Sequence, residues 1–243
     1  MKFFRLAFGL LALGVSRGLL GQPDHPPILD FDFTLMASAR VPDLAYVQLK
    51  PAARTKRQPE AADFEIIPVR VSSQGRSDLY HYAGPAPLRF VRTAGHAPHL
   101  SVRRVVAILE SAASTQRTLI VLMPRESGDF ELLAIDDGAA AFPAGCARVL
   151  NLTGEGVYGS LDGNEWMLPA APKLTAPIAI DSSVRFGVTT TRRGRPIVVF
   201  DQTLAVVGNE QLLLVLLAPY RPGADIRTRV VRDRIVEGNL EED

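Results

Sequence analysis

Cysteine is almost absent from this sequence: Cys146 is the only one among 243 residues. A single thiol cannot form an internal disulfide, which excludes a small disulfide-stapled scaffold and leaves stability to a hydrophobic core. Cys146 stands at the expected start of a strand after Pro143 and Gly145, and all four histidines precede it in the chain. We therefore interpret Cys146 as a packing residue and not as a nucleophile.

Sequence motifs give no support for catalysis either. The chain contains no GxxxxGK[ST] or HExxH pattern. The glycine-rich stretch GEGVYGSLDG at 154–163 precedes an expected strand and lacks the following helix that would direct its amides at a phosphate. The HAPH stretch at residues 96–99 has no neighbouring cysteine or carboxylate, so it predicts no metal site. The adjacent Asp136 and Asp137 would point to opposite faces of a strand, unlike the paired carboxylates of a glycosidase. The sequence predicts no catalytic residue, metal or cofactor, and favours a protein that is not an enzyme.

Neither sign of charge predominates, because the chain has 27 Lys and Arg residues and 26 Asp and Glu residues, which gives a net charge of +1. Such a chain generates no general field that attracts nucleic acid or anionic lipid, and we expect neither as a partner.

The first 22 residues, MKFFRLAFGLLALGVSRGLLGQ, place Lys2 and Arg5 before an apolar run that Arg17 interrupts. This layout is typical of a secretory signal peptide, and the run is too short to span a bilayer. We expect an exported protein, periplasmic or extracellular, that is not an integral membrane protein after cleavage.

The rest of the chain divides by composition. We expect an extended, proline-rich lead-in over residues 23–40, a β-rich region over 41–168, a C-terminal β region over 169–236 and a disordered acidic tail over 237–243. The stretch LPAAPKLTAP at 168–177 is either a linker between two domains or a crossover within one.

Short apolar runs separated by turn residues predict an all-β fold of antiparallel β-sandwiches, immunoglobulin-like or similar. Pro68 lacks an amide hydrogen, so its strand should lie at a sheet edge or contain a bulge. The run SVRRVVAIL at 101–109 fits a helical stripe or a strand, and we favour a strand. LLLVLLA at 212–218 suits a central strand buried on both faces.

Trp166 and Tyr158 are the candidate ligand-binding residues, because aromatic rings on a β-sandwich can form a platform for sugars. The alternative for a lone tryptophan after a turn is a place in the core.

Two stretches carry a family resemblance: GRSDLYHYAGPAPLRF at 75–90 and FELLAIDDGAAAFPAGCARVLNLTGEGVYGSLDG at 130–163, which contains an FPxGxxRxxNL pattern. They resemble an uncharacterised family of exported bacterial β-rich proteins, over residues 64 to about 235. In that pattern the position of Cys146 commonly holds another small residue. The resemblance implies an exported β-rich protein and brings no activity with it.

Three functions remain open. The first is a noncatalytic structural or protein-interaction module of the cell envelope, and the second is a carbohydrate-binding β-sandwich; the partner is accordingly an envelope protein or a glycan. The third is a hydrolase, which would require His81, His96 or His99 to converge with Asp136, Asp137 or Cys146. We favour the first, because an all-β chain without a catalytic constellation is typical of a binding scaffold.

Overall fold

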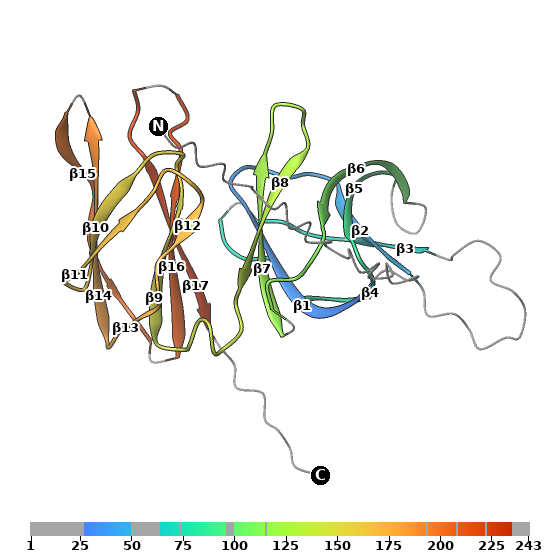
Figure 1. Cartoon of the computed structure of the whole chain (residues 1–243), viewed down its shortest axis with the longest axis horizontal. Coiled ribbons are helices and arrows are strands. Elements are labelled where there is room, and N and C mark those ends of the chain that lie inside the picture. The colour runs from blue at the N-terminus through green and yellow to red at the C-terminus, as the bar shows by residue number, and fades with distance from the viewer. Residues whose placement is uncertain are drawn as a thin grey trace, which may run out of the picture.

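The computed structural model describes residues 27–49, 64–72, 74–95, 100–114, 116–192, 194–207, 209–221 and 223–234. All regular secondary structure in these residues is β-strand (Figure 1), which confirms the all-β prediction. The expected signal peptide, the acidic tail, His96 and His99 lie outside the described residues.

The N-terminal half consists of two four-stranded sheets. Sheet A has the order β4-β1-β7-β8 and sheet B the order β3-β2-β5-β6. Neighbours pair antiparallel except β1 and β7, which are parallel. The strands are β1 (Ile28–Ala37), β2 (Leu44–Leu49), β3 (Phe64–Pro68), β4 (Tyr80–Pro85), β5 (Leu88–Ala94), β6 (Ser101–Leu109), β7 (Arg117–Pro124) and β8 (Phe130–Asp136).

The C-terminal half also consists of two sheets. Sheet C has the order β12-β9-β16-β17, with β13 pairing beside β12 on β9, and sheet D has the order β11-β10-β14-β15. The one parallel pair is β9 with β16. The strands are β9 (Cys146–Leu152), β10 (Val157–Leu161), β11 (Asn164–Leu168), β12 (Lys173–Leu174), β13 (Ile178–Ala179), β14 (Ser183–Arg192), β15 (Arg195–Ala205), β16 (Glu210–Leu217) and β17 (Arg227–Arg234).

The two halves have the same topology. When β12 and β13, which both pair with β9, are counted as one broken strand, each half has eight strands. In each half the first strand then pairs in parallel with the seventh, the second and third strands form a hairpin, and the fourth returns to the edge beside the first. The fifth and sixth strands then extend the second sheet, and the seventh and eighth extend the first. The chain is therefore a tandem duplication of one mixed-sheet sandwich, although the sequence shows no repeat.

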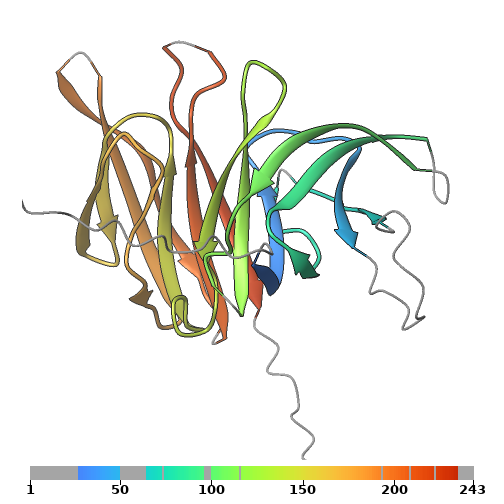
Figure 2. The ribbon, with the colours of Figure 1, turned by 45° about the vertical axis from the view of Figure 1, so that its right-hand side comes forward.

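The four sheets stack in the order B, A, C, D (Figures 1 and 2). One hydrophobic cluster fills the space between B and A, and a second fills the space between C and D. A third cluster joins A to C through Met36, Leu119, Val121, Leu213 and Val215. Because apolar packing of this kind joins the halves, they form a continuous stack of layers.

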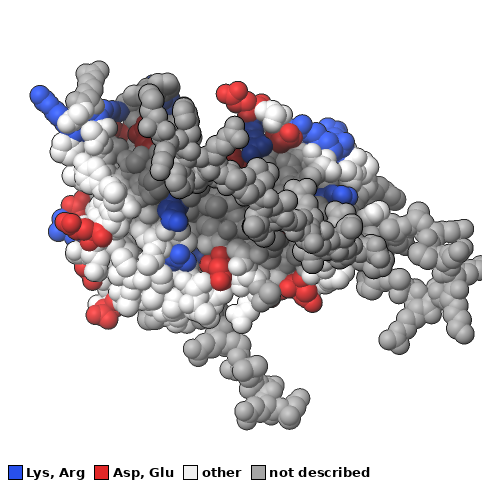
Figure 3. Space-filling model, in the orientation of Figure 1, with Lys and Arg blue, Asp and Glu red and all other residues white. Residues whose placement is uncertain are grey.

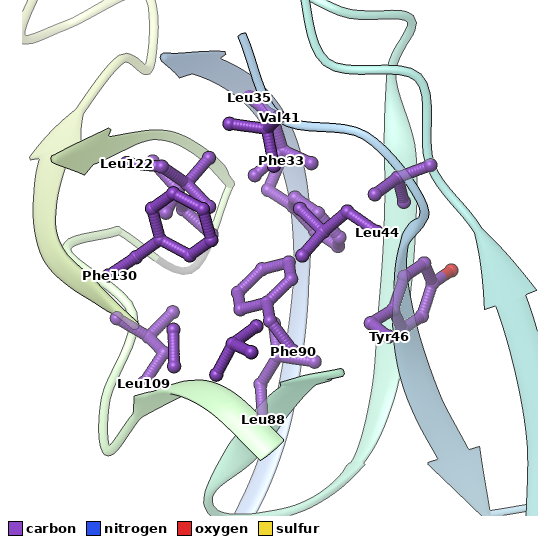
Figure 4. Packing of buried hydrophobic residues seen from close by; sticks show 14 of the residues in the cluster. Phe33, Leu35, Val41, Leu44, Tyr46, Leu88, Phe90, Leu109, Leu122 and Phe130 are labelled. Carbon is purple, nitrogen blue, oxygen red and sulfur yellow. The ribbon is translucent and has the colours of Figure 1, made fainter. Parts of the chain in front are cut away.

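The first cluster centres on Phe33 of β1, which is fully buried between Tyr46 and Phe90 of sheet B (Figure 4). Its ring centroid lies 5.4 Å from that of Tyr46 and 6.1 Å from that of Phe90, both in edge-on geometry. Such contacts add to the stabilisation that burial of the rings supplies.

β16 is buried along its whole length because it lies between β9 and β17 and has cores on both faces. This confirms the prediction of a central, doubly buried strand for LLLVLLA. Cys146 begins β9 as a buried free thiol in the cluster between sheets A and C, and burial raises its pKa. A thiol in this state is a poor nucleophile, as the packing interpretation requires.

Two parts of the chain are organised differently from expectation. The sequence predicts an extended lead-in over residues 23–40, yet Ile28–Ala37 form β1, a central strand of sheet A whose Phe31, Phe33 and Leu35 face the core. The boundary between the two halves lies between Asp136 and Cys146 and not near residue 168, because β9 pairs with β16 and β10 pairs with β14. LPAAPKLTAP is a crossover that returns the chain from sheet D to sheet C.

Other predictions are confirmed. Residues 101–109 form β6, and Pro68 ends β3, which lies at the edge of sheet B. The FPxGxxRxxNL pattern has a structural role at the junction of the halves: Phe142 is buried and the Arg148 guanidinium lies 5.6 Å from the centre of its ring. Burial lowers the pKa of Arg148.

A buried ion network lies at the same junction. Asp137, which follows β8, pairs with Arg76 and Arg117, and Asp233 of β17 lies 2.5 Å from the Nη2 atom of Arg117. The side chains of Asp137 and Arg76 are only 1% and 6% exposed. Opposite charges thus join the last strand of the C-terminal half to the N-terminal half.

Candidate functional site

The candidate site is the outer face of sheet D, the terminal layer of the stack. Val184, Phe186 and Val188 of β14 are buried, so Arg185, Gly187 and Thr189 point away from the core, because successive side chains of a strand point to opposite faces. This outer face therefore belongs to alternate residues of β10, β11, β14 and β15.

Strand register arranges these outward residues in two rows across the sheet. One row runs Met167, Tyr158, Thr189, Val198, and is mainly apolar. The neighbouring row runs Glu165, Ser160, Gly187, Asp201, and is polar with a glycine in it. Adjacent strands lie about 4.8 Å apart, so each row is about 14 Å long.

The two rows border an open hollow of about 750 Å³, within the range of about 300–1,000 Å³ in which small-molecule sites fall. Gly187 has no side chain and Ser160 has a small one, so the bottom of the hollow stays unfilled at these two residues. A Cβ atom at Gly187 would enter the hollow 2.9 Å from the Ser160 Oγ. The lining residues are Tyr158, Gly159, Ser160, Gly163, Glu165, Trp166, Met167, Arg185, Gly187, Val188, Thr189, Val198 and Asp201.

The duplicated fold does not itself require this hollow. Sheet B is the counterpart of sheet D, and on its own outer face the two middle strands pair Ala45 with Val91 and Val47 with Arg89. In sheet D the pair at the middle of the face is Ser160 with Gly187. Because neither of these pairs of sheet B contains a glycine, the pair of Ser160 with Gly187 is a particular feature of the C-terminal half.

Arg185 and Asp201 form a rigid planar pair at one end of the hollow. The Arg185 Nε and Nη2 atoms donate to the two Asp201 carboxylate oxygens over 2.8 and 2.7 Å. This hydrogen bonding lowers the pKa of Asp201 and raises the pKa of Arg185, so both stay charged. A two-pronged pair of this kind is held in one orientation while its outer edges stay open to solvent.

The structure places both sequence-predicted residues at this hollow. Tyr158 is 37% exposed at the middle of the apolar row, between Met167 and Thr189. Trp166 also lines the hollow but packs against the core between sheets C and D. Its Nε1 atom is buried and has no hydrogen-bond partner among the described residues. Tyr158 is thus the accessible aromatic ring, and Trp166 supports the wall.

Gly159 provides the space that Trp166 occupies. A Cβ atom at residue 159 would lie 2.0 Å from the Gly187 carbonyl oxygen and 2.7 Å from the Trp166 ring. We expect Gly159→Ala to lower the free energy of unfolding by about 1–3 kcal/mol, because the clash involves backbone and a packed ring. Urea denaturation measures this, with Gly75→Ala as control, since a Cβ at Gly75 meets nothing within 4 Å. Equal stability of the two variants would contradict the conclusion that Gly159 leaves the space in which the Trp166 ring packs.

The residues proposed for a hydrolase pair with other groups. The His81 Nδ1 lies 2.9 Å from Asp32 on the exposed surface, whereas Asp137 is held by Arg76 and Arg117. Within the described ranges, no three His, Cys, Asp or Glu side chains gather closely enough to hold a metal ion. Sequence reasoning missed Gly187, Ser160, Arg185 and Asp201 as site residues.

Charges of both signs are scattered over the described surface shown in Figure 3, and acidic and basic groups lie close together at its upper edge. This distribution agrees with the near-zero net charge.

Comparisons with known proteins do not assign the chain to a family. A scan of protein-family models and a search of curated proteins both find no match to the chain. Among the residues that the structure describes, no helix has the length and hydropathy to span a membrane.

Proposed function

We propose that this protein is a noncatalytic, exported binding module of the cell envelope, and that its ligand lies in the hollow on the outer face of sheet D. The observation that carries the proposal is the hollow itself, an open site with an apolar row beside a polar row on the end layer of the stack.

The carboxylates of the hollow suit binding better than hydrolysis. Glu165 lies on β11 and Asp201 on β15, the two opposite edges of sheet D. Their strands are three interstrand spacings apart, about 14 Å. Glycosidases hold their two carboxyl groups about 5–9.5 Å apart, a shorter distance than the one between the strands that carry this pair. Asp201 is in addition occupied by Arg185.

The layered architecture supports the same function. Every lining residue of the hollow except Gly163 lies on a strand of sheet D, and three successive hydrophobic clusters support that sheet from the stack behind it. A site on such elements is held in its binding geometry before the ligand arrives.

Retention of the tagged mature protein on its native cell envelope tests the proposal. We expect Tyr158→Ala to weaken retention at least tenfold, about 1.4 kcal/mol, because central aromatic residues dominate binding energy. Tyr220→Ala is the matched control, since Tyr220 is an exposed tyrosine (86%) outside the hollow. Retention that is unaffected by Tyr158→Ala, or reduced equally by both variants, would overturn the proposed site.

A further inference from the structure

We infer that the ligand of the hollow on sheet D is a neutral saccharide chain lying across the strands. The inference rests on the proposed function and names the chemical class of the ligand.

The apolar row suits the carbon-bound face of a sugar ring. Tyr158 presents a partly exposed aromatic ring, and Met167 and Val198 at the two ends of the row are 81% and 65% exposed. A pyranose ring has one broad face of C–H groups that packs against such flat apolar surface. The row spans all four strands, which favours a chain of several rings over a single one.

The polar row suits the hydroxyl groups at the rim of the same ring. A sugar hydroxyl both donates and accepts, so its site needs acceptors and donors side by side. Glu165 supplies acceptor oxygens, Ser160 can donate or accept, and the fixed Arg185–Asp201 pair supplies both. Apolar and polar groups are thus separated by two residues along β10, β11 and β14 and by three along β15, so they lie side by side on one face, as a ring with an apolar face and a polar rim requires.

Other ligand classes fit less well. An anion would face the carboxylates of Glu165 and Asp201, and the one guanidinium among the lining residues is already paired. A wholly apolar ligand would strip water from the polar row without replacing its hydrogen bonds. An extended peptide would recognise a sheet through the backbone of an edge strand, whereas this hollow is lined by side chains on the face of the sheet and spans all four strands.

Chemical treatment of the native envelope tests the inference. The probe is the envelope itself, treated either with periodate, which cleaves the vicinal diols of sugars, or with protease. We expect retention of the protein to survive protease and to fall at least tenfold after periodate, with neutral oligosaccharides released from the envelope competing for the remaining binding.

Gly187→Val provides a variant that fills the hollow without disturbing the core. The nearest obstacle to the new side chain is the rotatable Ser160 hydroxyl, so the fold should be kept, which thermal denaturation checks. We expect this variant to lose saccharide binding at least tenfold, while Gly75→Ala binds normally.

The outcomes separate the two proposals. Retention that depends on Gly187 and Tyr158 but is lost after protease and survives periodate would overturn the saccharide and keep the binding site. Competition by acidic saccharides alone would also overturn a neutral ligand. Retention that ignores both residues would overturn the proposed function itself.

Discussion

Replacement of Asp137 by alanine should lower the free energy of unfolding by about 3–5 kcal/mol, because it leaves the buried guanidinium of Arg76 without its main partner. Arg76 is 6% exposed, and its other acidic neighbour, Asp233, is 3.5 Å away. Removing one member of a buried ion pair costs far more than the pair contributes, since the remaining charge must stay in a medium of low polarity. Chemical denaturation measures the change.

The exposed pair between Arg125 and Glu131 provides the control. Their side chains are 60% and 53% exposed, so Glu131→Ala should change stability by less than about 1 kcal/mol. The double variant Asp137→Leu with Arg76→Met should recover much of the loss, because it removes both charges together. A cost for Asp137→Ala as small as that for Glu131→Ala would show that Asp137 does not compensate the buried charge of Arg76.

Phe33→Ala should destabilise the protein by about 3–5 kcal/mol, the cost of removing a fully buried aromatic ring that its neighbours cannot replace. The rings of Phe31, Tyr46, Tyr80 and Phe90 all lie within 6.1 Å of Phe33, centre to centre.

Phe33→Leu is the graded control, since it keeps most of the buried apolar volume and should cost less than the alanine variant. If Phe33→Ala unfolded at the same denaturant concentration as the wild type, β1 would not be the central strand of the first core.

β1 shows why local sequence reasoning succeeded in some places and failed in others. The run DFDFTL alternates apolar and polar residues as a strand does, but the prolines just before it suggested a lead-in. β16 was predicted correctly because seven consecutive apolar residues leave no polar face to expose. The burial of β16 could be predicted because the residues of the strand itself specify it, without reference to the rest of the chain.

The duplication and the site depend on contacts that the linear sequence does not display. Arg76 and Asp233 meet across 157 positions of the chain, and nothing near either residue specifies the other. Tyr158 was recognisable as an aromatic residue beside a turn. Its polar neighbours were not, because Ser160 and Gly187 become a pair only through the register of β10 with β14.

Crosslinking from within the hollow tests the central claim most directly. A photoreactive residue in place of Met167 would lie at the β11 end of the apolar row, and the same residue in place of Tyr220 would be equally exposed (81% and 86%) outside the hollow. The account predicts that illumination on the native envelope links position 167, and not position 220, to envelope material. Equal linkage from both positions, or linkage from position 220 alone, would contradict it.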